Sequence, residues 1–533
     1  MKEIKMFPKV HFIGGANAML LSCIYAETLD DLVNKYEDGR GNYPKGFLHT
    51  STYEHGGTCY YKEMWSRDCG RGVIELVGNG FIREAEAVVD YFLSHITNGD
   101  SWSREIHAPN STNDQELDGN ALILLSIYIV WKRVAHSRAL EFIDKLMPVL
   151  KKFCGDIHFS ATGLLQSISE LSANPCVEYG VYGVLGNYSM LLALKAMDEM
   201  ATYAGKDLPF LKDAVNKLTL GLQNLVSDGV HSKAPAGCWL NGLDSRDMSV
   251  YDTADFAGVI CDFSASTRII PFIFEYDYKE LSQFCDIHKA SYRYLKEKMA
   301  EGYYFRKYGF VSNTAWSGIG GRHDDSMAGY GQGFFTQAAL YMDDVNCYSK
   351  CLEGIARLGY DGNVIDVLSD GEISPFIMHE CFHYENYEKA LDHTFGALSE
   401  GRENVMNNRG DEGNLVQAAE NLKAIRMSLG IRAEGKTLVV APKLPWLSEG
   451  VEVSDFPVFT EKGMVRIGLK YSMLRYNRRA ELVLTSGAEN FQNVVVRFGP
   501  FSLSLKEENV QKSENAKWVI KKFNIGERMV FEY

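Results

Sequence analysis

Hydrophobic residues recur three and four positions apart through most of the first 430 residues, which is the spacing of one face of an α-helix. The segments in which this spacing is clearest are 72–96, 115–135, 137–153, 187–203, 208–226, 278–299, 328–342 and 415–429. Weaker helical segments are 13–35, 262–274, 347–358, 375–384 and 388–399. The pattern therefore predicts about a dozen helices in this part of the chain.

Long loops rich in Gly, Asn, Asp, Ser, His and Trp separate alternate helices. These loops are 102–118, 228–255, 309–325, 361–374 and 399–413. Loops of this length are uncommon in a compact domain unless they have a function. Helices joined alternately by short and long connections predict an (α/α)6 toroid, a closed ring of helical hairpins with the long loops around a cleft at one end. An open superhelix of hairpins would show a repeated motif, and the chain has none.

The pattern changes after residue 430, where apolar and polar residues alternate in short runs. The runs are KTLVVAP, MVRIGLKYS, AELVLTS, NVVVRFG, KWVIKKF and RMVFEY, with Gly, Asn and Pro between them. Such alternation is typical of half-buried antiparallel strands. We therefore expect a mainly α protein with a helical domain over residues 1–430 and an antiparallel β-sandwich over residues 431–533, the latter acting as a structural brace.

Composition and charge narrow the possible partners. The chain is 46% hydrophobic and 23% charged, as in globular proteins, and its net charge of −14 would repel nucleic acid and anionic lipid. Its eleven cysteines form no CxxC pair, which favours reduced thiols over disulfides. The N-terminus lacks the unbroken apolar run of a signal peptide, and no run of about 18 apolar residues occurs. We expect a soluble cytoplasmic protein without a nucleic-acid or membrane partner.

The long loops carry carboxylates beside Trp, Tyr and His, which suits a carbohydrate site because sugars present apolar faces and hydroxyl groups. Trp65-Ser66-Arg67-Asp68 stands just before a strong helix, where Ser66 or Asp68 could also be only an N-cap. The segment 113–119, NDQELDG, also precedes a helix and could be only an acidic first turn.

Glu178, in the segment NPCVEYG at 174–180, lies before a helix without being placed to cap it. Tyr179 and Tyr182 are close in sequence. Such surroundings could raise the pKa of the carboxyl and keep it protonated near neutral pH, as a general acid requires.

These segments together resemble the six-hairpin glycosidases, most closely the glucoamylase-type and dextran-glucosidase-type inverting hydrolases. Trp65-Ser66-Arg67-Asp68 resembles the family's W-x-R-D, Asp118-Gly119 its D-G at the head of the next inner helix, and Val177-Glu178 its W-E segment. A further segment, GNLVQA at 413–418, is similar to the last inner helix. The chain departs from the family in having Val177 in place of Trp and its β-sandwich at the C-terminal end.

The resemblance implies an exo-acting inverting glycoside hydrolase that cleaves a terminal sugar from a small oligosaccharide or glycoside, without a metal or an organic cofactor. It implies that Glu178 is the general acid. It also implies that Arg67 and Asp68 hold the terminal sugar. We expect Asp118 to hold it with them, and the aromatic side chains of Trp65 and Tyr179 to take part in substrate binding.

Inversion also requires a general base, with the two carboxyl groups roughly 6.5 to 9.5 Å apart. In the family this base precedes the last inner helix, which selects Glu403. Asp411 and Glu412 are alternatives at the start of that helix, where they could equally be first-turn acids, and Glu372 is a further one.

Two other motifs suggest different chemistry. His379-Glu380-Cys381-Phe382-His383 is a literal HExxH, which on a helix would bind zinc in a metallopeptidase; otherwise its histidines would be helix residues near the cleft rim. The glycine-rich stretch 318–333 lacks the context of a phosphate loop, so His323, Asp324 and Asp325 either line the cleft or belong to a turn. An inverting phosphorylase and a non-catalytic sugar-binding protein on the same scaffold remain alternatives.

Overall fold

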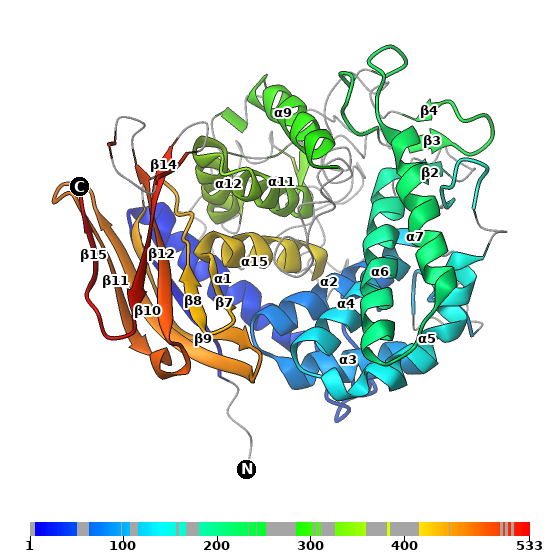
Figure 1. Ribbon diagram of the computed structural model, residues 1–533, viewed down its shortest axis with the longest axis horizontal. Coiled ribbons are helices and arrows are strands. Elements are labelled where there is room, and N and C mark those ends of the chain that lie inside the picture. Colours follow the sequence, from blue (N-terminus) through cyan, green and yellow to red (C-terminus); the bar gives the residue numbers. More distant parts are fainter. Residues whose placement is uncertain are drawn as a thin grey trace.

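The computed structural model places two bodies side by side, a ring of helices and a β-sandwich (Figure 1). It describes residues 6–50, 63–96, 99–106, 116–155, 159–166, 181–232, 234–240, 242–251, 284–301, 305–306, 309, 311, 326–358, 381–383, 415–446, 448–501, 505–506, 510–512 and 516–533.

Helices in alternation form the inner and the outer wall of the ring. In the part of the chain that the structure describes, the inner helices are α2 (Ser66–Gly78), α4 (Leu117–Arg133), α6 (Val184–Tyr203), α11 (Gly329–Tyr341) and α15 (Leu415–Leu429). The outer helices are α1 (Ala16–Asn34), α3 (Ile82–Ser94), α5 (Ala139–Cys154), α7 (Pro209–Gly221), α9 (Cys285–Glu301) and α12 (Val345–Leu358). The inner helices adjoin one another in the order α11, α15, α2, α4, α6, and α1 packs against α12. The first and last hairpins therefore meet, which confirms a closed toroid.

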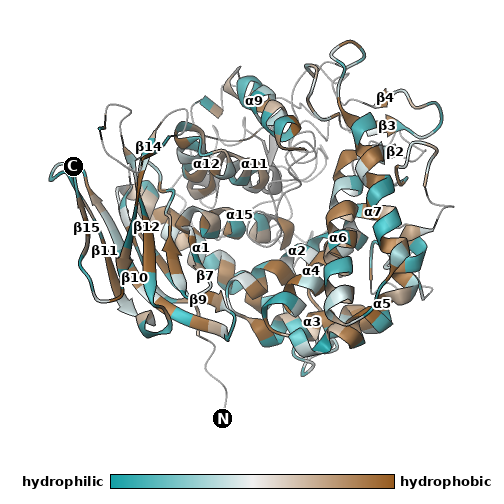
Figure 2. Cartoon of the chain, viewed as in Figure 1, coloured by the Kyte–Doolittle hydropathy of each residue, from teal (hydrophilic) through white to brown (hydrophobic). Residues whose placement is uncertain are grey.

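Burial distinguishes the two walls. Every residue of α4 from Leu117 to Trp131 is buried, and so are 15 of the 20 residues of α6. In α5 the buried residues recur at helical spacing on one face, as in Phe142, Leu146 and Val149. Hydrophobic residues accordingly run along α4 and α6 and along strands of the sandwich (Figure 2). A helix that is apolar on all sides belongs inside a fold, whereas an amphipathic one covers it.

Two glycines let α2 and α4 lie close together. A Cβ on Gly70 would lie 2.8 Å from the carbonyl carbon of Leu122, and a Cβ on Gly119 would lie 2.3 Å from Ser66 Oγ. Neither position has room for a side chain. Gly119 is the glycine of the D-G motif, so its place in the motif has a packing reason.

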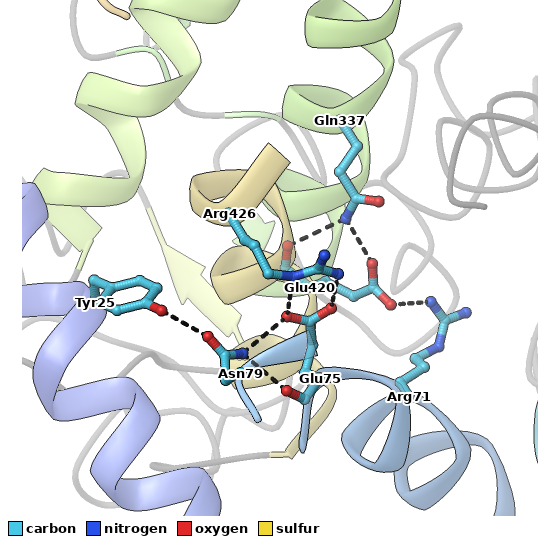
Figure 3. Close-up of polar contacts among 7 residues, drawn as sticks. All are labelled: Tyr25, Arg71, Glu75, Asn79, Gln337, Glu420 and Arg426. Atoms are coloured by element: carbon cyan, nitrogen blue, oxygen red, sulfur yellow. Dashed lines mark hydrogen bonds and ion pairs between the residues drawn. The ribbon is translucent and has the colours of Figure 1, made fainter. Parts of the chain in front are cut away.

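A buried polar network joins α2 to α1, α11 and α15 (Figure 3). Arg71 Nη1 donates to Glu420 Oε1 at 2.6 Å, and Arg426 Nη2 donates to Glu75 Oε1 at 2.8 Å. Because the partners of these ion pairs are 349 and 351 residues apart, they connect the first inner helix with the last. Buried charges require such partners, since desolvation strongly disfavours a lone charge.

Neutral side chains extend the same network. Gln337 Nε2, on α11, donates to Glu420 Oε2 at 2.6 Å, and Tyr25 Oη, on α1, donates to Asn79 Oδ1 at 2.6 Å (Figure 3). Burial raises the pKa of Tyr25 far above its usual value, so its hydroxyl keeps the proton that it donates.

The C-terminal region forms a sandwich of two five-stranded sheets, which confirms the predicted sandwich. One sheet has the order β1 (Lys9–Gly14), β9 (Ser448–Thr460), β10 (Gly463–Leu474), β11 (Arg479–Ser486), β15 (Met529–Glu532). The other has the order β13 (Val510–Lys512), β14 (Lys517–Asn524), β12 (Asn493–Phe501), β8 (Thr437–Val440), β7 (Ile431–Glu434). All strand pairs are antiparallel except β8 with β12.

Strand β1 comes from the opposite end of the chain. It pairs with β9 so that Phe12 faces Val451, and its side chains alternate between buried and exposed up to Phe12. The sequence analysis missed this strand and placed 13–35 in a helix that in fact begins at Ala16. The division of the chain at residue 430 stays a prediction. The sandwich, however, includes β1, which comes from the first 430 residues.

Two other helix predictions are wrong. The segment 72–96 is not one helix, because the chain breaks at Asn79–Phe81, where Gly80 has φ +85° and Asn79 Nδ2 donates to the Glu75 carbonyl oxygen at 2.8 Å. In the segment 375–384, Cys381–His383 form strand β6, which pairs with β5 (Ser326–Ala328). The last residues of HExxH are thus extended.

No helix among the described residues has both the length and the apolar character needed to cross a membrane.

An aromatic cluster around His288 joins α6 to α9. Trp239 Nε1 donates to His288 Nδ1 at 2.9 Å, so the imidazole proton is on Nε2, which lies 3.2 Å from Tyr188 Oη. All three side chains are buried. Burial lowers the pKa of His288 from 6.5 to about 3, so the ring is neutral in the folded protein.

We expect this histidine to make folding sensitive to acid. Between pH 6.5 and about 3 the unfolded chain binds a proton at residue 288 that the folded chain does not, so the free energy of unfolding falls as the pH is lowered. In His288→Gln the amide oxygen can accept from Trp239 and the amide nitrogen can donate to Tyr188, and the amide does not titrate. Urea denaturation between pH 7.5 and 4 should show the variant losing less stability than the wild type, and parallel stability curves would contradict the assignment.

We also expect Gly70→Ala to destabilise the ring. Alanine in a helix interior normally gains about 0.5–1 kcal/mol over glycine, but here its Cβ would press on the Leu122 backbone, and overpacking costs about 1–3 kcal/mol. Gly41→Ala is the control, because Gly41 is exposed and lies outside any helix, and a Cβ there would meet only the end of the Glu37 side chain at 3.5 Å, an ordinary contact. Chemical denaturation should show a lower free energy of unfolding for Gly70→Ala alone. Equal changes in the two variants would disprove the close packing.

Candidate active site

Four of the predicted site residues lie in the described part of the chain: Trp65, Arg67, Asp68 and Asp118. The remaining predictions fall outside the described residues, and these are Glu178, Tyr179, His323, Asp324, Glu403 and Glu412, together with Asp325 and the alternative bases Glu372 and Asp411. The structure therefore describes the four residues predicted to hold the sugar, and the two predicted catalytic carboxylates lie outside it.

The W-x-R-D segment opens α2. Trp65 occupies the N-cap position and Ser66 is the first helical residue, with no side chain capping the helix, so the N-cap interpretation of Ser66 or Asp68 is wrong. Asp68 lies in the first turn, where the helix dipole favours a negative charge. Because neither Ser66 nor Asp68 caps the helix, capping does not account for this motif.

Backbone hydrogen bonds fix the start of α2. The Trp65 N–H donates to Thr50 Oγ1 at 3.1 Å, and the Ser66 N–H donates to the Arg104 carbonyl oxygen at 2.8 Å. The guanidinium of Arg104 lies over the Trp65 ring, 4.8 Å from its centre. Arg104 was missed in the sequence analysis, because nothing in the sequence links it to Trp65.

Arg67 and Asp118 form a two-pronged ion pair between α2 and α4. Arg67 Nε donates to Asp118 Oδ2 at 2.5 Å, and Arg67 Nη2 donates to Asp118 Oδ1 at 3.1 Å. Arg67 is 7% exposed and Asp118 is fully buried. Paired hydrogen bonds of this kind fix the guanidinium plane as well as its position.

A second carboxylate adjoins the same guanidinium. Glu116 Oε1 lies 3.4 Å from Arg67 Nη2, and Glu116 is 1% exposed. Glu116 stands two residues before Asp118 in the acidic segment 113–119, but the sequence analysis did not single it out. Two buried carboxylates thus share one arginine.

The ion pair controls the ionisation of Asp118. Burial raises the pKa of Asp118, but the charge and hydrogen bonds of Arg67, with a smaller contribution from Arg71, outweigh burial and hold the pKa below its usual value. Asp118 is therefore ionised near neutral pH and does not act as a proton donor.

The inner helices begin at one end of the ring, where these residues lie. Thr50 bonds to the start of α2 and also accepts from the Leu415 N–H at 2.8 Å, at the start of α15. A Cβ on Gly186, near the start of α6, would lie 3.1 Å from the Leu117 side chain at the start of α4. The starts of α2, α4, α6 and α15 therefore lie at the same end of the ring.

Short strands lie in the connections between the helices. β2 (Val181–Gly183), three residues after Glu178, pairs with β3 (Gly242–Asp244), which pairs with β4 (Val250–Tyr251). In the β5–β6 pair Ser326 faces His383. The extended backbone of β6 does not offer the two-histidine helix face that the zinc interpretation requires. Among the residues that the structure describes, no group of three or more His, Cys, Asp or Glu could hold a metal ion.

Solved structures share the architecture of the whole chain. A GH78 rhamnosidase of Bacillus sp. GL1 superposes with a TM-score of 0.57 and 12% identity over 93% of this chain and 43% of that protein. The α-L-rhamnosidase from Dictyoglumus thermophilum superposes with a TM-score of 0.56 and 10% identity over 99% of this chain and 51% of that protein. The Streptomyces avermitilis α-L-rhamnosidase complexed with L-rhamnose superposes with a TM-score of 0.53 and 10% identity over 98% of this chain and 42% of that protein.

At these identities the likeness establishes the fold, and the chain spans about half or less of the length of these proteins. No protein-family model matches the sequence, and no curated protein matches it. The structure thus agrees with the resemblance found in the sequence: the chain has the (α/α)6-toroid fold of the six-hairpin glycosidases, with a β-sandwich beside the ring.

Proposed function

We propose that the protein is an exo-acting inverting glycoside hydrolase that removes a terminal sugar from a small oligosaccharide or glycoside. The observation that supports this most is the pair Arg67–Asp118, which holds an arginine rigidly where the inner helices of a glycosidase-type toroid begin. Its two residues belong to two separate motifs of the resemblance, and the fold brings them together.

In this proposal the four described residues have different tasks. Arg67 donates hydrogen bonds to sugar hydroxyls, and Asp68, one residue further along the first turn of α2, accepts from them. Trp65 supplies an apolar ring for the sugar face. Asp118 is too buried to reach a ligand, so it orients Arg67 instead of touching the sugar.

The chemical step needs two further carboxyl groups. Glu178 would protonate the leaving oxygen and Glu403 would take a proton from the attacking water, with Asp411, Glu412 and Glu372 as alternatives for the base. Tyr179, His323 and Asp324 would line the cleft. The reaction requires no cofactor. The rhamnosidases that share the fold make L-rhamnosides a first choice in a substrate panel.

The general acid can be tested with leaving groups of different basicity. Glu178→Gln should lower turnover of a sugar or alkyl glycoside by about 10²–10⁴-fold, while a nitrophenyl glycoside, whose leaving group needs little protonation, should lose far less. Glu489→Gln, on a short turn of the sandwich, is the control. NMR of the first-formed anomer tests inversion. Equal losses on both substrates would exclude Glu178 as the acid, and retention would exclude the mechanism.

Asp118→Asn tests the orienting role. Arg67 would keep its neighbour Glu116 but lose the charge of Asp118 and one of the two paired hydrogen bonds, and a misplacement of about 1 Å can cost roughly 10²-fold in rate. We expect kcat/KM to fall by about 10–100-fold. Removing one partner of a buried ion pair costs about 3–5 kcal/mol, so unfolding should be easier too. Asp38→Asn, which removes the exposed partner of Arg40, should change neither quantity. Unchanged kinetics in Asp118→Asn would refute this role.

A further inference from the structure

A repeated contact links inner helices of the ring to the connections that precede them. Three of the described inner helices, α4, α6 and α11, carry an amide side chain at their fourth position, and these residues are Asn120, Asn187 and Gln332. All three are fully buried. Each accepts from a backbone N–H, 18, 22 and 21 residues earlier in the chain respectively. Gln332, for example, accepts from the Val311 N–H at 2.9 Å and donates to the Gly309 carbonyl oxygen at 3.0 Å.

The fourth position of α2 makes a related contact, whereas that of α15 has no polar group. Cys69 Sγ donates to the Leu48 carbonyl oxygen, 21 residues earlier, at 3.2 Å. In α15 the fourth residue is Ala418, and the start of this helix is held instead by the Thr50 carbonyl oxygen, which accepts from the Leu415 N–H. Four of the five described inner helices thus fix the preceding connection from the same position. The contact is hidden in the sequence because Cys, Asn and Gln all provide it.

Asn187 makes this contact at the start of α6. Its Oδ1 accepts from the Leu165 N–H at 2.7 Å, and its Nδ2 donates to the carbonyl oxygens of Leu165 and Gly183, both at 2.9 Å. One amide side chain can do this because it carries an acceptor as well as donors. Leu165 lies between α5 and α6, and Gly183 ends β2. Asn187 therefore holds the backbone on both sides of the segment 166–182 against α6.

The segment 166–182 contains Glu178, the proposed general acid. A general acid must come within about 2.6–3.2 Å of the atom that it protonates. Because a displacement of about 1 Å can lower a rate roughly 10²-fold, the backbone that carries the acid has to be held firmly. Pairing of β2 with β3 holds it after Glu178, and Asn187 holds it both before and after.

We propose that Asn187 is a positioning residue for Glu178, acting by anchoring the connection that carries this carboxyl group. The inference rests on the proposed function, because it takes Glu178 as the proton donor. Asn187 is too buried to touch a sugar, so it acts through the backbone. Loss of its two donated hydrogen bonds would release Leu165 and Gly183 from α6. The step that needs the proton of Glu178 would then suffer most.

Asn120 offers a matched comparison on α4. Its Oδ1 accepts from the Trp102 N–H at 2.9 Å, and its Nδ2 donates to the carbonyl oxygens of Trp102 at 3.0 Å and Glu116 at 2.9 Å. These are the same three hydrogen bonds that Asn187 makes, at the same position of an inner helix. The connection that Asn120 anchors does not contain Glu178. The two asparagines therefore differ in the connection that they hold and not in the kind of contact.

Replacing each asparagine by aspartate removes the donor group and keeps the shape of the side chain. Substrates are the methyl glycoside and the nitrophenyl glycoside of one sugar. Asn187→Asp should lower kcat/KM on the methyl glycoside about ten-fold more than on the nitrophenyl glycoside, because only the former needs a well-placed acid. Any loss in Asn120→Asp should be the same on both. Equal effects on the two substrates in Asn187→Asp, or the same preference in Asn120→Asp, overturn the proposal.

Hydrogen exchange followed by mass spectrometry tests the anchor without any activity. Asn187→Asp should speed exchange in peptides covering 159–166 and 181–183 and leave 99–106 unchanged, whereas Asn120→Asp should speed it in 99–106 alone. Unchanged exchange in Asn187→Asp overturns the anchor. If the wild type hydrolyses no glycoside, the proposed function fails and the role of Asn187 in catalysis fails with it, while the exchange rates still show whether the contact exists.

Thermal melting checks that each variant is folded. If Asn187→Asp does not fold, Asn187→Gln replaces it in both measurements, since it keeps an amide but moves it by one methylene group. The same two outcomes then decide. A folded Asn187→Gln protein with wild-type exchange in 159–166 and an equal effect on both glycosides overturns the proposal, and a selective loss on the methyl glycoside with faster exchange supports it.

Discussion

The closure of the ring by buried ion pairs is the constraint on which the rest of this structure depends. Arg71–Glu420 and Glu75–Arg426 link the first inner helix to the last, across 349 and 351 residues. Each charge would be costly alone in this interior, so the arrangement is stable only when both helices are in place. An open array of the same hairpins would leave Arg71 and Glu75 without these partners. Closure thus follows from electrostatics as well as from apolar packing.

Polar residues on successive turns of α2 connect these ion pairs with the candidate site. Arg67, Arg71, Glu75 and Asn79 follow one another at intervals of four residues, which places them on successive turns. Each reaches a different partner: Asp118 on α4, Glu420 and Arg426 on α15, and Tyr25 on α1. Because α2 is tied to its neighbours at every turn, Arg67 stands on a rigid support. A rigid support suits the proposed sugar-holding role of Arg67, since little conformational entropy is then lost when a ligand binds.

Sequence reasoning reached the architecture and part of the site. Helical spacing located α15 to the residue, and alternation located β8, β10, β11, β12, β14 and β15, because both patterns reflect which side of an element is buried. The motif order led to Arg67 and Asp118. The break at Gly80 was missed because apolar spacing continues on both sides of it, and β1 was missed because its alternation merges with the helix that follows. The partners of Arg71 and Glu75 had no local signal at all, since they are set by closure of the whole ring.

Strand β1 has a consequence for how this chain is made. Lys9 leaves the ribosome long before its partner Ser454, which is synthesised only after the whole ring. Until then a strand with buried Val10 and Phe12 has no sheet to join, and unpaired apolar strands of this kind promote association between nascent chains. Chaperone binding during translation, or a delay in its last stage, should therefore affect the yield of this protein more than its final stability.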